Sequence, residues 1–503
     1  MNTSKTRVSK TYSAQISGIN ADIITIEADI SNGLHTFSIV GLGDRAVAES
    51  RDRISSAIKN SGFVSPKQKN HKVVISLAPA DIRKEGPVFD LGMAMAYLLA
   101  THEIFFESET KLFLGELSLE GNIRPVYGVL AMVRTAQEHG FTEIYVSKEN
   151  AREAALIQNI AVYPANSLKE IIDHLSLNDF SLPRAAPAYP TDQISRVNCT
   201  KNTIDFNQIV GQENAKRALE IAAAGRHTIA MYGPPGAGKT MLAKAFPTIL
   251  PQLSYEESIE VTAIHSIAKI LKNEIVRVAP FRAPHHTSSY TSLIGGGGNT
   301  LHTGEITLAH KGVLFLDEFP EFDRRVIDSL RQPLEDRKIT ITRAHGTITY
   351  PADCIVILAM NPCPCGYLEK KKCICTDNEI LRYKKKISGP IADRIDIWIS
   401  VSKVPYSALE NVTDTVFSSL SMQKRVISAR EFEKKIGSAT PLTLTLSNEV
   451  RSILVSFSEK LNLSTRGYTK TIRVARTIAN LAGSDEIKKE HLLEALQYRQ
   501  KDF

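Results

Sequence analysis

Strand-like and helical patterns of apolar residues organise the N-terminal third of the chain. Residues 21–30, 71–79 and 142–147 have the apolar spacing of strands, whereas residues 46–62 have the spacing of a helix with one apolar face. Strands mixed with such helices are typical of a compact α/β unit. The pattern therefore predicts an α/β domain over residues 1–185.

Further along the chain the pattern changes twice. Periodicity is lost from 190 to 205, and the segment before it, 181–190, has three prolines within ten residues. This predicts a linker at 186–200. Helical patterns dominate the last hundred residues, where the helix expected over 465–483 ends on a glycine suited to a C-cap. We therefore expect a C-terminal helical (lid) domain at 403–503.

The most informative motif is GPPGAGKT, which stands between a strand-like run at 227–232 and a helix-forming run at 241–246. Such a loop turns its backbone N–H groups toward phosphate oxygens, its lysine meets the β and γ phosphates, and its threonine can hold Mg²⁺. The motif predicts ATP and Mg²⁺ as cofactors. Its residues are Gly233, Pro234, Pro235, Gly236, Ala237, Gly238, Lys239 and Thr240.

An apolar strand that ends in two carboxylates, VLFLDE at 313–318, supplies the other half of the expected site. Asp317 would bind the water shell of Mg²⁺, and Glu318 would orient or deprotonate the attacking water. Asn361 ends a second buried run and is placed to polarise that water, unless it only terminates the strand. These residues predict ATP hydrolysis in a P-loop domain at 201–402.

A hairpin is expected where Ile339 and Ile341 alternate with threonines before a turn at Gly346. Its tip would present Arg343 and His345, which are the candidate DNA contacts. Upstream, the adjacent histidines at 285 and 286 are expected to diverge and to share no metal. We interpret residues 281–312 as an insertion that carries groups toward the pore of a ring or a subunit boundary.

Four cysteines form two pairs directly after the strand that ends at Asn361. Two pairs of thiolates could close a tetrahedral Zn²⁺ site, although one intervening residue is tight for two ligands of one metal, and unligated thiols are the alternative. Lysine runs at 370–372 and 384–386, before and after the second pair, would suit a phosphate backbone, or they form a solvated face. The cysteines are Cys363, Cys365, Cys373 and Cys375.

Composition narrows the picture only a little. The 503 residues are 43% apolar, which suffices for folded cores, and no run of about 18 apolar residues predicts a membrane span. The polar N-terminus has no apolar stretch behind it, so we expect a cytoplasmic protein. A net charge of +7 permits a polyanionic partner but is too diffuse to establish one.

Three motifs, at 317–319, 360–366 and 388–396, together resemble the AAA+ ATPases of the magnesium-chelatase type. The longer segments 281–322 and 37–63 resemble the ComM/YifB proteins, and this likeness extends over essentially the whole chain. The resemblance implies homo-hexameric ATPase rings that act on single-stranded or branched DNA. It further implies a DNA helicase that promotes branch migration during natural transformation, with recombination proteins as partners.

The resemblance also implies roles for individual residues. Asn361 matches the sensor-1 position, Arg394 the arginine finger that enters a neighbouring subunit's site, and Arg473 the sensor-2 arginine. A finger arginine is worth about 10³ to 10⁵ in rate in related systems. The alternatives are that Arg394 pairs with Asp393 or Asp396 on a surface turn, and that Arg473 is a solvated helix residue. For the role of Arg473, two other arginines compete, Arg466 and Arg476.

Two N-terminal segments, 84–98 and 121–150, resemble the proteolytic domain of Lon-type proteases. Those enzymes need a serine nucleophile and a lysine that accepts its proton. The serine position holds Val88 and the lysine position holds Met132, and neither nearby Lys84 nor Arg134 supplies a nucleophile. The sequence thus predicts the Lon-like fold without protease activity.

The leading hypothesis is therefore an ATP-driven ring motor on DNA. The alternative is a AAA+ protein-remodelling or chelatase-type ATPase without a DNA substrate. Chelatase motor subunits lack the N-terminal domain, which disfavours that version of the alternative.

Overall fold

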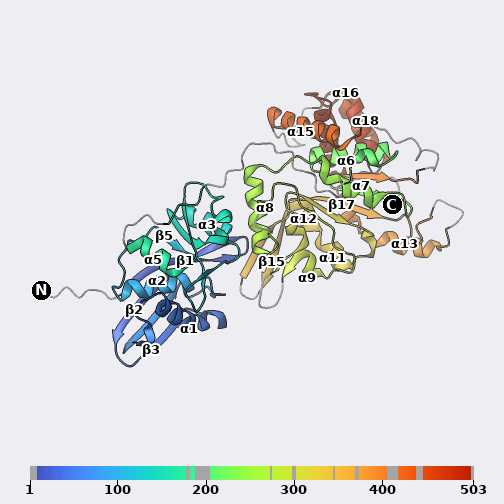
Figure 1. The fold of residues 1–503 in the computed structure, drawn as a ribbon. Coiled ribbons are helices and arrows are strands. Elements are labelled where there is room, and N and C mark those ends of the chain that lie inside the picture. Colours follow the sequence, from blue (N-terminus) through green and yellow to red (C-terminus); the bar gives the residue numbers. More distant parts are fainter. Residues whose placement is uncertain are drawn as a thin grey trace. The chain divides into compact units, whose positions relative to one another are not determined.

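The chain forms two compact units in the structure, a computed structural model (Figure 1). Unit 1 contains Met1–Thr191 together with Ile259–Ile275, and unit 2 contains Asp192–Ser258 and Val276–Phe503. The linker expected at 186–200 lies, apart from its first residue, outside the described residues. The structure describes residues 8–68, 70–176, 182–186, 204–271, 275–296, 302–343, 346–368, 373–404, 417–437 and 446–499.

Unit 1 is built on a seven-stranded sheet in the order β3-β4-β2-β1-β5-β8-β9. Strands β1, β2 and β4 are antiparallel neighbours, whereas the outer pairs are parallel. The strands are β1 (Val8–Ser17), β2 (Asn20–Asn32), β3 (Thr36–Val40), β4 (His71–Ala78), β5 (Lys111–Phe113), β8 (Glu143–Ser147) and β9 (Ala161–Ala165). A separate short pair is formed by β6 (Glu116–Leu117) and β7 (Ile123–Arg124).

Helices α2 and α3 pack against the antiparallel part of this sheet. Close packing of α2 depends on Gly92, where an added Cβ would lie 2.6 Å from Ile26 Cδ1. The helices of unit 1 are α1 (Arg45–Asn60), α2 (Asp90–Ala100), α3 (Val129–Glu138), α4 (Ala151–Ala154) and α5 (Leu168–Ser176).

A segment from the middle of the chain completes unit 1. Helix α8 (Tyr255–Ile267) starts in unit 2, but from Ile259 its residues belong to unit 1. There the Ser266 hydroxyl accepts from the Gly128 N–H at 2.9 Å and donates to the Glu153 carboxylate at 2.5 Å. The N-terminal unit therefore incorporates a segment that follows the phosphate-binding motif in sequence.

Unit 2 contains a five-stranded parallel sheet in the order β11-β14-β17-β10-β18. Alternate residues along each strand face opposite sides, because successive side chains in a strand point to opposite faces. Ile229 and Met231 of β10 join one apolar core, and Ala230 joins the other. The strands are β10 (Ile229–Tyr232), β11 (Phe281–Arg282), β14 (Val313–Leu316), β17 (Ile355–Met360) and β18 (Ile397–Ser400).

Helices cover both faces of this sheet. The first core contains α6 (Glu213–Gly225), α7 (Lys239–Ala245), α15 (Ser419–Ile436), α16 (Asn448–Lys460), α17 (Thr465–Leu481) and α18 (Lys489–Gln497). The second contains residues of α9 (Tyr290–Ile294), α10 (Glu305–Leu308), α11 (Arg324–Ser329) and α14 (Gly389–Ala392). Two further helices are α12 (Arg331–Asp336) and α13 (Asp377–Lys385), and two hairpins are β12 (Gly295–Gly296) with β13 (His302–Thr303), and β15 (Lys338–Arg343) with β16 (Gly346–Pro351).

The expected α/β architecture with a P-loop core and C-terminal helices is confirmed. The predicted helix at 465–483 is α17, and Gly483 follows it with a φ of +65°, as a left-handed C-terminal glycine should. No helix within the described ranges has both the length and the apolar character needed to cross a bilayer.

Candidate nucleotide site

The phosphate-binding motif links β10 to α7 at the carboxyl edge of the parallel sheet. Gly236 and Gly238 have φ values of +73° and +96°, which glycine adopts without steric cost. Gly233 has no room for a side chain, because an added Cβ would lie 2.0 Å from the Val401 carbonyl oxygen. The glycines therefore shape a loop whose backbone can close around phosphate oxygens.

Lys239 is the charged group of this loop, and it is 8% exposed. Its ammonium donates to the carbonyls of Gly233 at 2.7 Å and Pro234 at 3.1 Å, and to Asn361 Oδ1 at 3.2 Å. Burial lowers the pKa of Lys239, and nearby Asp317 and Glu318 offset only part of that effect. All three acceptors are neutral oxygens.

The predicted Mg²⁺ ligands meet across the loop. Thr240 Oγ1 donates to Asp317 Oδ2 at 2.8 Å, so a hydroxyl and a carboxylate, both hard oxygen donors suited to Mg²⁺, lie together. Glu318 follows with a left-handed φ of +50°, and its N–H donates to Asp317 Oδ1 at 3.0 Å. The residues present thus fit a Mg²⁺–triphosphate complex.

Asn361 joins this group because β17 lies between β10 and β14 in the sheet. The carboxyl ends of three neighbouring strands therefore bring Lys239, Asp317 and Asn361 to one place. Asn361 does more than end a strand, since its amide oxygen accepts from Lys239. A sensor role for it remains a prediction.

Arg394 lies in an intrachain ion pair. It is 9% exposed, its Nη1 donates to the Pro390 carbonyl at 2.7 Å, and its Nε donates to Glu335 at 3.1 Å. Arg466 binds the same glutamate at 2.6 Å. The alternative pairing with Asp393 or Asp396 is not observed, because Asp396 is held instead by Lys470 at 2.6 Å. To act in a neighbouring site, Arg394 would have to leave Glu335.

The three arginines considered for the sensor-2 role differ in their contacts. Arg466 is committed to Glu335, and Arg476 donates to Asn480 Oδ1 at 2.8 Å and to the Asp485 carbonyl at 2.5 Å. Arg473 is half-buried on α17, and it forms no ion pair with another described residue. Arg466 and Arg476 are thus engaged by other described residues, and Arg473 stays the sensor-2 prediction.

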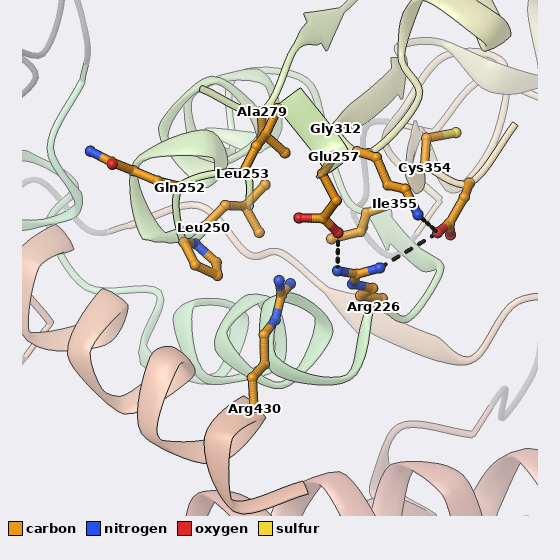
Figure 2. Close-up of a pocket in the computed structure, with 13 residues that line it drawn as sticks. Arg226, Leu250, Gln252, Leu253, Glu257, Ala279, Gly312, Cys354, Ile355 and Arg430 are labelled. Carbon is orange, nitrogen blue, oxygen red and sulfur yellow. Dashed lines mark hydrogen bonds and ion pairs between the residues drawn. The ribbon is translucent and has the colours of Figure 1, made fainter. Parts of the chain in front are cut away.

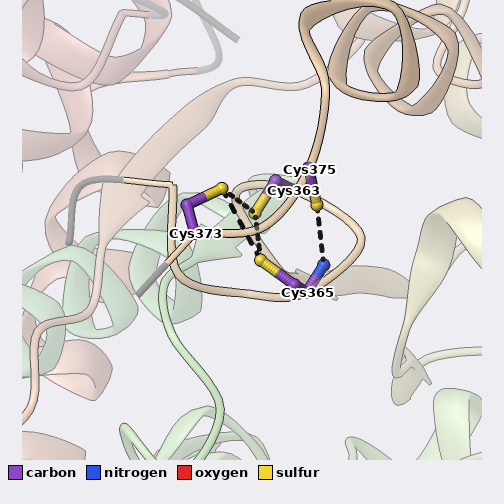
Figure 3. Close-up of side chains that lie close together, drawn as sticks. All are labelled: Cys363, Cys365, Cys373 and Cys375. Carbon is purple, nitrogen blue, oxygen red and sulfur yellow. Dashed lines mark hydrogen bonds between the residues drawn. The ribbon is translucent and has the colours of Figure 1, made fainter. Parts of the chain in front are cut away.

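The four cysteines of the two pairs converge on one point (Figure 3). Sγ of Cys363 lies 3.4 Å from that of Cys365 and 3.9 Å from that of Cys373, and Cys365 and Cys373 are 3.6 Å apart. All four sulfur atoms, including that of Cys375, lie within 4.8 Å of one another. The single residue between the members of each pair does not prevent them from facing a common centre.

This cysteine cluster adjoins the nucleotide loop. Gly366, with a φ of +80°, has no space for a side chain, because an added Cβ would lie 2.6 Å from Pro235 Cδ and 3.7 Å from Asn361 Cγ. The turn that carries Cys363 and Cys365 therefore packs directly on the phosphate-binding loop.

The hairpin proposed to meet DNA is formed by β15 and β16, with Arg343 opposite Gly346 at its end. Ile339 is buried, as the alternating pattern predicts. The second candidate, His345, lies outside the described residues. DNA contact at this hairpin stays a prediction.

The matched protease positions in unit 1 hold buried apolar side chains, Val88 at 6% exposure and Met132 at 3%. Lys84 is fully buried, and its ammonium donates to the Pro79 carbonyl. The exposed Arg134 pairs with Glu138 one helical turn away. The described residues at these positions form no nucleophile–base pair.

One contact of the site was not predicted. His286 Nδ1 lies 3.2 Å from Glu318 Oε2. The expectation that His285 and His286 diverge is wrong, because a turn, not a regular strand, carries them and their ring centroids are 4.1 Å apart. The motif order alone gives no signal of the pairing, since it depends on which strand lies beside β14.

A surface hollow occurs at the amino ends of β14 and β17, away from the predicted site residues (Figure 2). Arg226 there binds Glu257 at 2.9 Å and Asp353 at 3.5 Å, and Lys311 binds Asp353 at 3.0 Å. Arg430 points into the hollow from α15. Most of these charges neutralise one another, so the hollow is part of the charge pairing that holds unit 2 together.

Three protein-family models match segments of this chain. A model described as magnesium chelatase, subunit ChlI, matches residues 205–409, and one described as its C-terminal part matches 417–499. A third, described as subunit ChlI of Mg-chelatase, matches residues 26–150. Together the three models span both units, and they support an AAA+ ATPase that uses ATP and Mg²⁺.

Relatives match over nearly the full length. Competence protein ComM of Haemophilus influenzae is 38% identical, covering 97% of this chain and 96% of the relative. Protein YifB of Escherichia coli is 40% identical, with 96% and 95% covered. The maternal DNA replication licensing factor mcm6 of Xenopus tropicalis is 21% identical over 55% of this chain and 32% of its own length. The chain therefore belongs to the ComM/YifB family of magnesium-chelatase-like AAA+ ATPases.

Proposed function

We propose that this protein is a hexameric ring motor that couples ATP hydrolysis to movement on single-stranded or branched DNA. Its task would be to drive branch migration during natural transformation or recombination, together with recombination proteins. The observation that carries the proposal is the likeness, over 97% of the chain, to a protein named for competence. The weaker likeness to a DNA replication licensing factor also supports DNA as the substrate.

The geometry supports the following division of labour in hydrolysis. Lys239 would exchange its carbonyl partners at Gly233 and Pro234 for phosphate oxygens, and Thr240 with Asp317 would hold Mg²⁺. Mg²⁺ supplies charge neutralisation at the phosphates when bound. Glu318 then accepts the proton of the attacking water.

Two arginines and one amide complete the proposed cycle. Asn361 orients the water, and Arg473 contacts the nucleotide from α17. Arg394 of one subunit stabilises the charge on the phosphate of the next subunit, after exchanging Glu335 for that phosphate. On this proposal hydrolysis requires a ring.

Whether the motor acts on DNA can be tested by measuring the ATPase rate without DNA, with single-stranded DNA and with a four-way junction. Strand displacement is then measured on the same sample. Stimulation with displacement is expected. The alternative is a protein-remodelling or chelatase-type ATPase without a DNA substrate. The names of the family models, one of which also matches 26–150, support its chelatase-type version. An ATPase rate indifferent to both DNAs, with no displacement, would support that alternative.

We also propose that Cys363, Cys365, Cys373 and Cys375 bind one Zn²⁺. The sulfur atoms of Cys363, Cys365 and Cys373 are 3.4 to 3.9 Å apart, close to the ~3.8 Å edge of a tetrahedron with Zn–S distances of about 2.3 Å, and that of Cys375 lies within 4.8 Å of them. Metal analysis of the purified chain is expected to give one zinc, which Cys373→Ser with Cys375→Ser removes and Cys354→Ser, outside the cluster, retains. Well under one zinc in the parent would indicate free thiols.

A further inference from the structure

The cysteine cluster lies between two regular elements of unit 2. Strand β17 ends at Met360, and the first pair of cysteines follows shortly after it. The second pair directly precedes α13, whose start is closed by a capping box between Thr376 and Glu379, with hydrogen bonds of 2.8 and 3.4 Å. A metal bound by all four sulfur atoms would therefore join the end of the sheet to the start of this helix.

Apolar packing contributes little to the placement of the second pair. Ile374, which lies between Cys373 and Cys375, is 86% exposed. The contacts of this pair with the first pair are made through sulfur. Cys373 Sγ is 3.6 Å from Cys365 Sγ, and the Cys365 N–H donates to Cys375 Sγ at 3.4 Å. Sulfur therefore links the two pairs, and a metal ion would strengthen this link.

The first pair belongs to a turn, residues 363–366, that packs on the phosphate-binding loop. The Gly366 N–H donates to the Cys363 carbonyl at 2.9 Å and closes the turn. Gly366 is buried, and an added Cβ there would lie 2.6 Å from Pro235 Cδ and 3.2 Å from Pro235 Cγ. Pro235 itself is an exposed residue, so the turn supports a part of the loop that otherwise faces solvent.

The turn also follows the amide that contacts the lysine of the loop. Asn361 Oδ1 accepts from Lys239 at 3.2 Å, and Asn361 Cγ lies 3.7 Å from where a Cβ at Gly366 would be. The first residue of the loop is held by the sheet, because the Gly233 N–H donates to the Met360 carbonyl at 3.2 Å. A displacement of the turn would thus disturb the far side of the loop and leave its start in place.

We infer that the turn at 363–366 is a positioning element for ATP binding, and that the zinc-bound cysteine cluster holds this turn against Pro235. The inference rests on the zinc site proposed above, and it does not depend on the DNA substrate. Four sulfur ligands close a structural zinc site and leave no position open to the nucleotide. The cluster therefore acts on the shape of the loop, and its effect appears in the affinity for ATP.

The test measures the Kd for ATP by calorimetry, without DNA and in excess Mg²⁺, with Glu318→Gln as the background so that ATP is consumed slowly. The Kd is compared before and after zinc is removed by a chelator selective for zinc over magnesium. Loss of contact for one or two CH₂ groups of the proline ring corresponds to a change of about three- to tenfold. The Kd should rise by that factor on removal of zinc and should return when Zn²⁺ is added back.

Two sets of variants separate the contact from a general effect on the fold. Adding Cys373→Ser with Cys375→Ser to this background should give the raised Kd and no response to the chelator. Pro235→Ala removes the ring on which the turn packs, so removal of zinc should then change the Kd by less than about twofold. A chelator effect in Pro235→Ala as large as that without this substitution would refute the inference, because zinc would then act through the fold alone.

Metal analysis of the same samples distinguishes the possible failures. One zinc per chain together with a Kd that does not change on its removal would overturn the inference and leave the zinc site standing. Well under one zinc would overturn the zinc site and the inference together. Absence of DNA stimulation of the ATPase would count against the proposed motor function alone, because these measurements are made without DNA.

Discussion

Two buried lysines, one in each unit, lie in contrasting surroundings. Burial lowers the pKa of both Lys84 and Lys239. Lys84 donates to one backbone carbonyl in unit 1, and an apolar Val88 occupies the nearby position matched to a nucleophile. Lys239 meets two carbonyls and the amide of Asn361, with two carboxylates close by.

The difference shows that burial of a charged group does not by itself make a site. The groups around Lys239 come from three neighbouring strand ends, and the proposed ATP site requires them to exchange their protein partners for ligand atoms. The contact of Lys84 holds the chain near the cis Ala78–Pro79 bond and serves the fold. The two lysines differ because several polar groups converge on Lys239, whereas Lys84 contacts a single backbone carbonyl.

The sharpest way to break this comparison is to remove each lysine. Lys239→Ala is expected to lose ATP binding and all turnover, because the phosphates lose their cation. Lys84→Met, which keeps the length of the side chain, should bind and hydrolyse ATP like the parent. Titration calorimetry and ATPase assays measure both. A loss in Lys84→Met equal to that in Lys239→Ala would contradict the assignment.

Removal of Arg394 tests whether an arginine from one subunit acts in the ATP site of the neighbouring subunit. Arg394→Ala should retain ATP binding while turnover falls about 10³- to 10⁵-fold. The matched control is Arg466→Ala, which loses the more exposed partner of the same Glu335 and should be much less affected. Mixing Arg394→Ala with Lys239→Ala subunits should restore some activity, and no rescue would argue against action across an interface.

The role of Glu318 in ATP hydrolysis can be tested separately from ATP binding. Glu318→Gln should bind ATP normally and hydrolyse it about 10²- to 10⁴-fold more slowly, because an amide cannot accept the proton of water. Glu321→Gln is the control, since that glutamate pairs with Lys386 on the surface. Equal rates in Glu318→Gln and the parent would remove this residue from the mechanism.

The smallest effect concerns a carboxylate that serves only the fold. Burial by itself would raise the pKa of Asp353, but Arg337 and Lys311 bring it down to about 2. A lowered pKa stabilises the folded state above about pH 4, and this contribution is lost as the pH falls toward 2. Asp353→Asn should therefore lower the free energy of unfolding by about 2 kcal/mol at pH 7.

The pH dependence supplies the control for that variant. Between pH 4 and pH 2 the parent should lose more stability than Asp353→Asn, as measured by urea unfolding with Lys239→Ala as a folded reference. Parallel curves for the parent and Asp353→Asn would contradict the role of Asp353 while leaving the nucleotide site unaffected.

The sequence predicted the parts of the site that lie on one continuous motif or at the end of a long apolar strand. Lys239, Asp317 and Asn361 are found this way, because the loop chemistry and the carboxyl edge of a parallel sheet leave few other places for them. Contacts between residues far apart in the chain could not be predicted from the sequence. The partner of Arg394 is 59 positions away, and β11, which brings His286 to Glu318, is a strand of only two residues.

The segment Ile259–Ile275 has a practical consequence for anyone who wants to dissect this protein genetically. Val261 and Ile264 are buried, and Ile267 lies against Gly128. A truncation that deletes the first 191 residues would leave these side chains without their packing partners and expose an apolar patch that favours aggregation. Aggregation of such a fragment would therefore reveal a cut through one folded unit, and it would say nothing about what the deleted residues contribute to the ATPase.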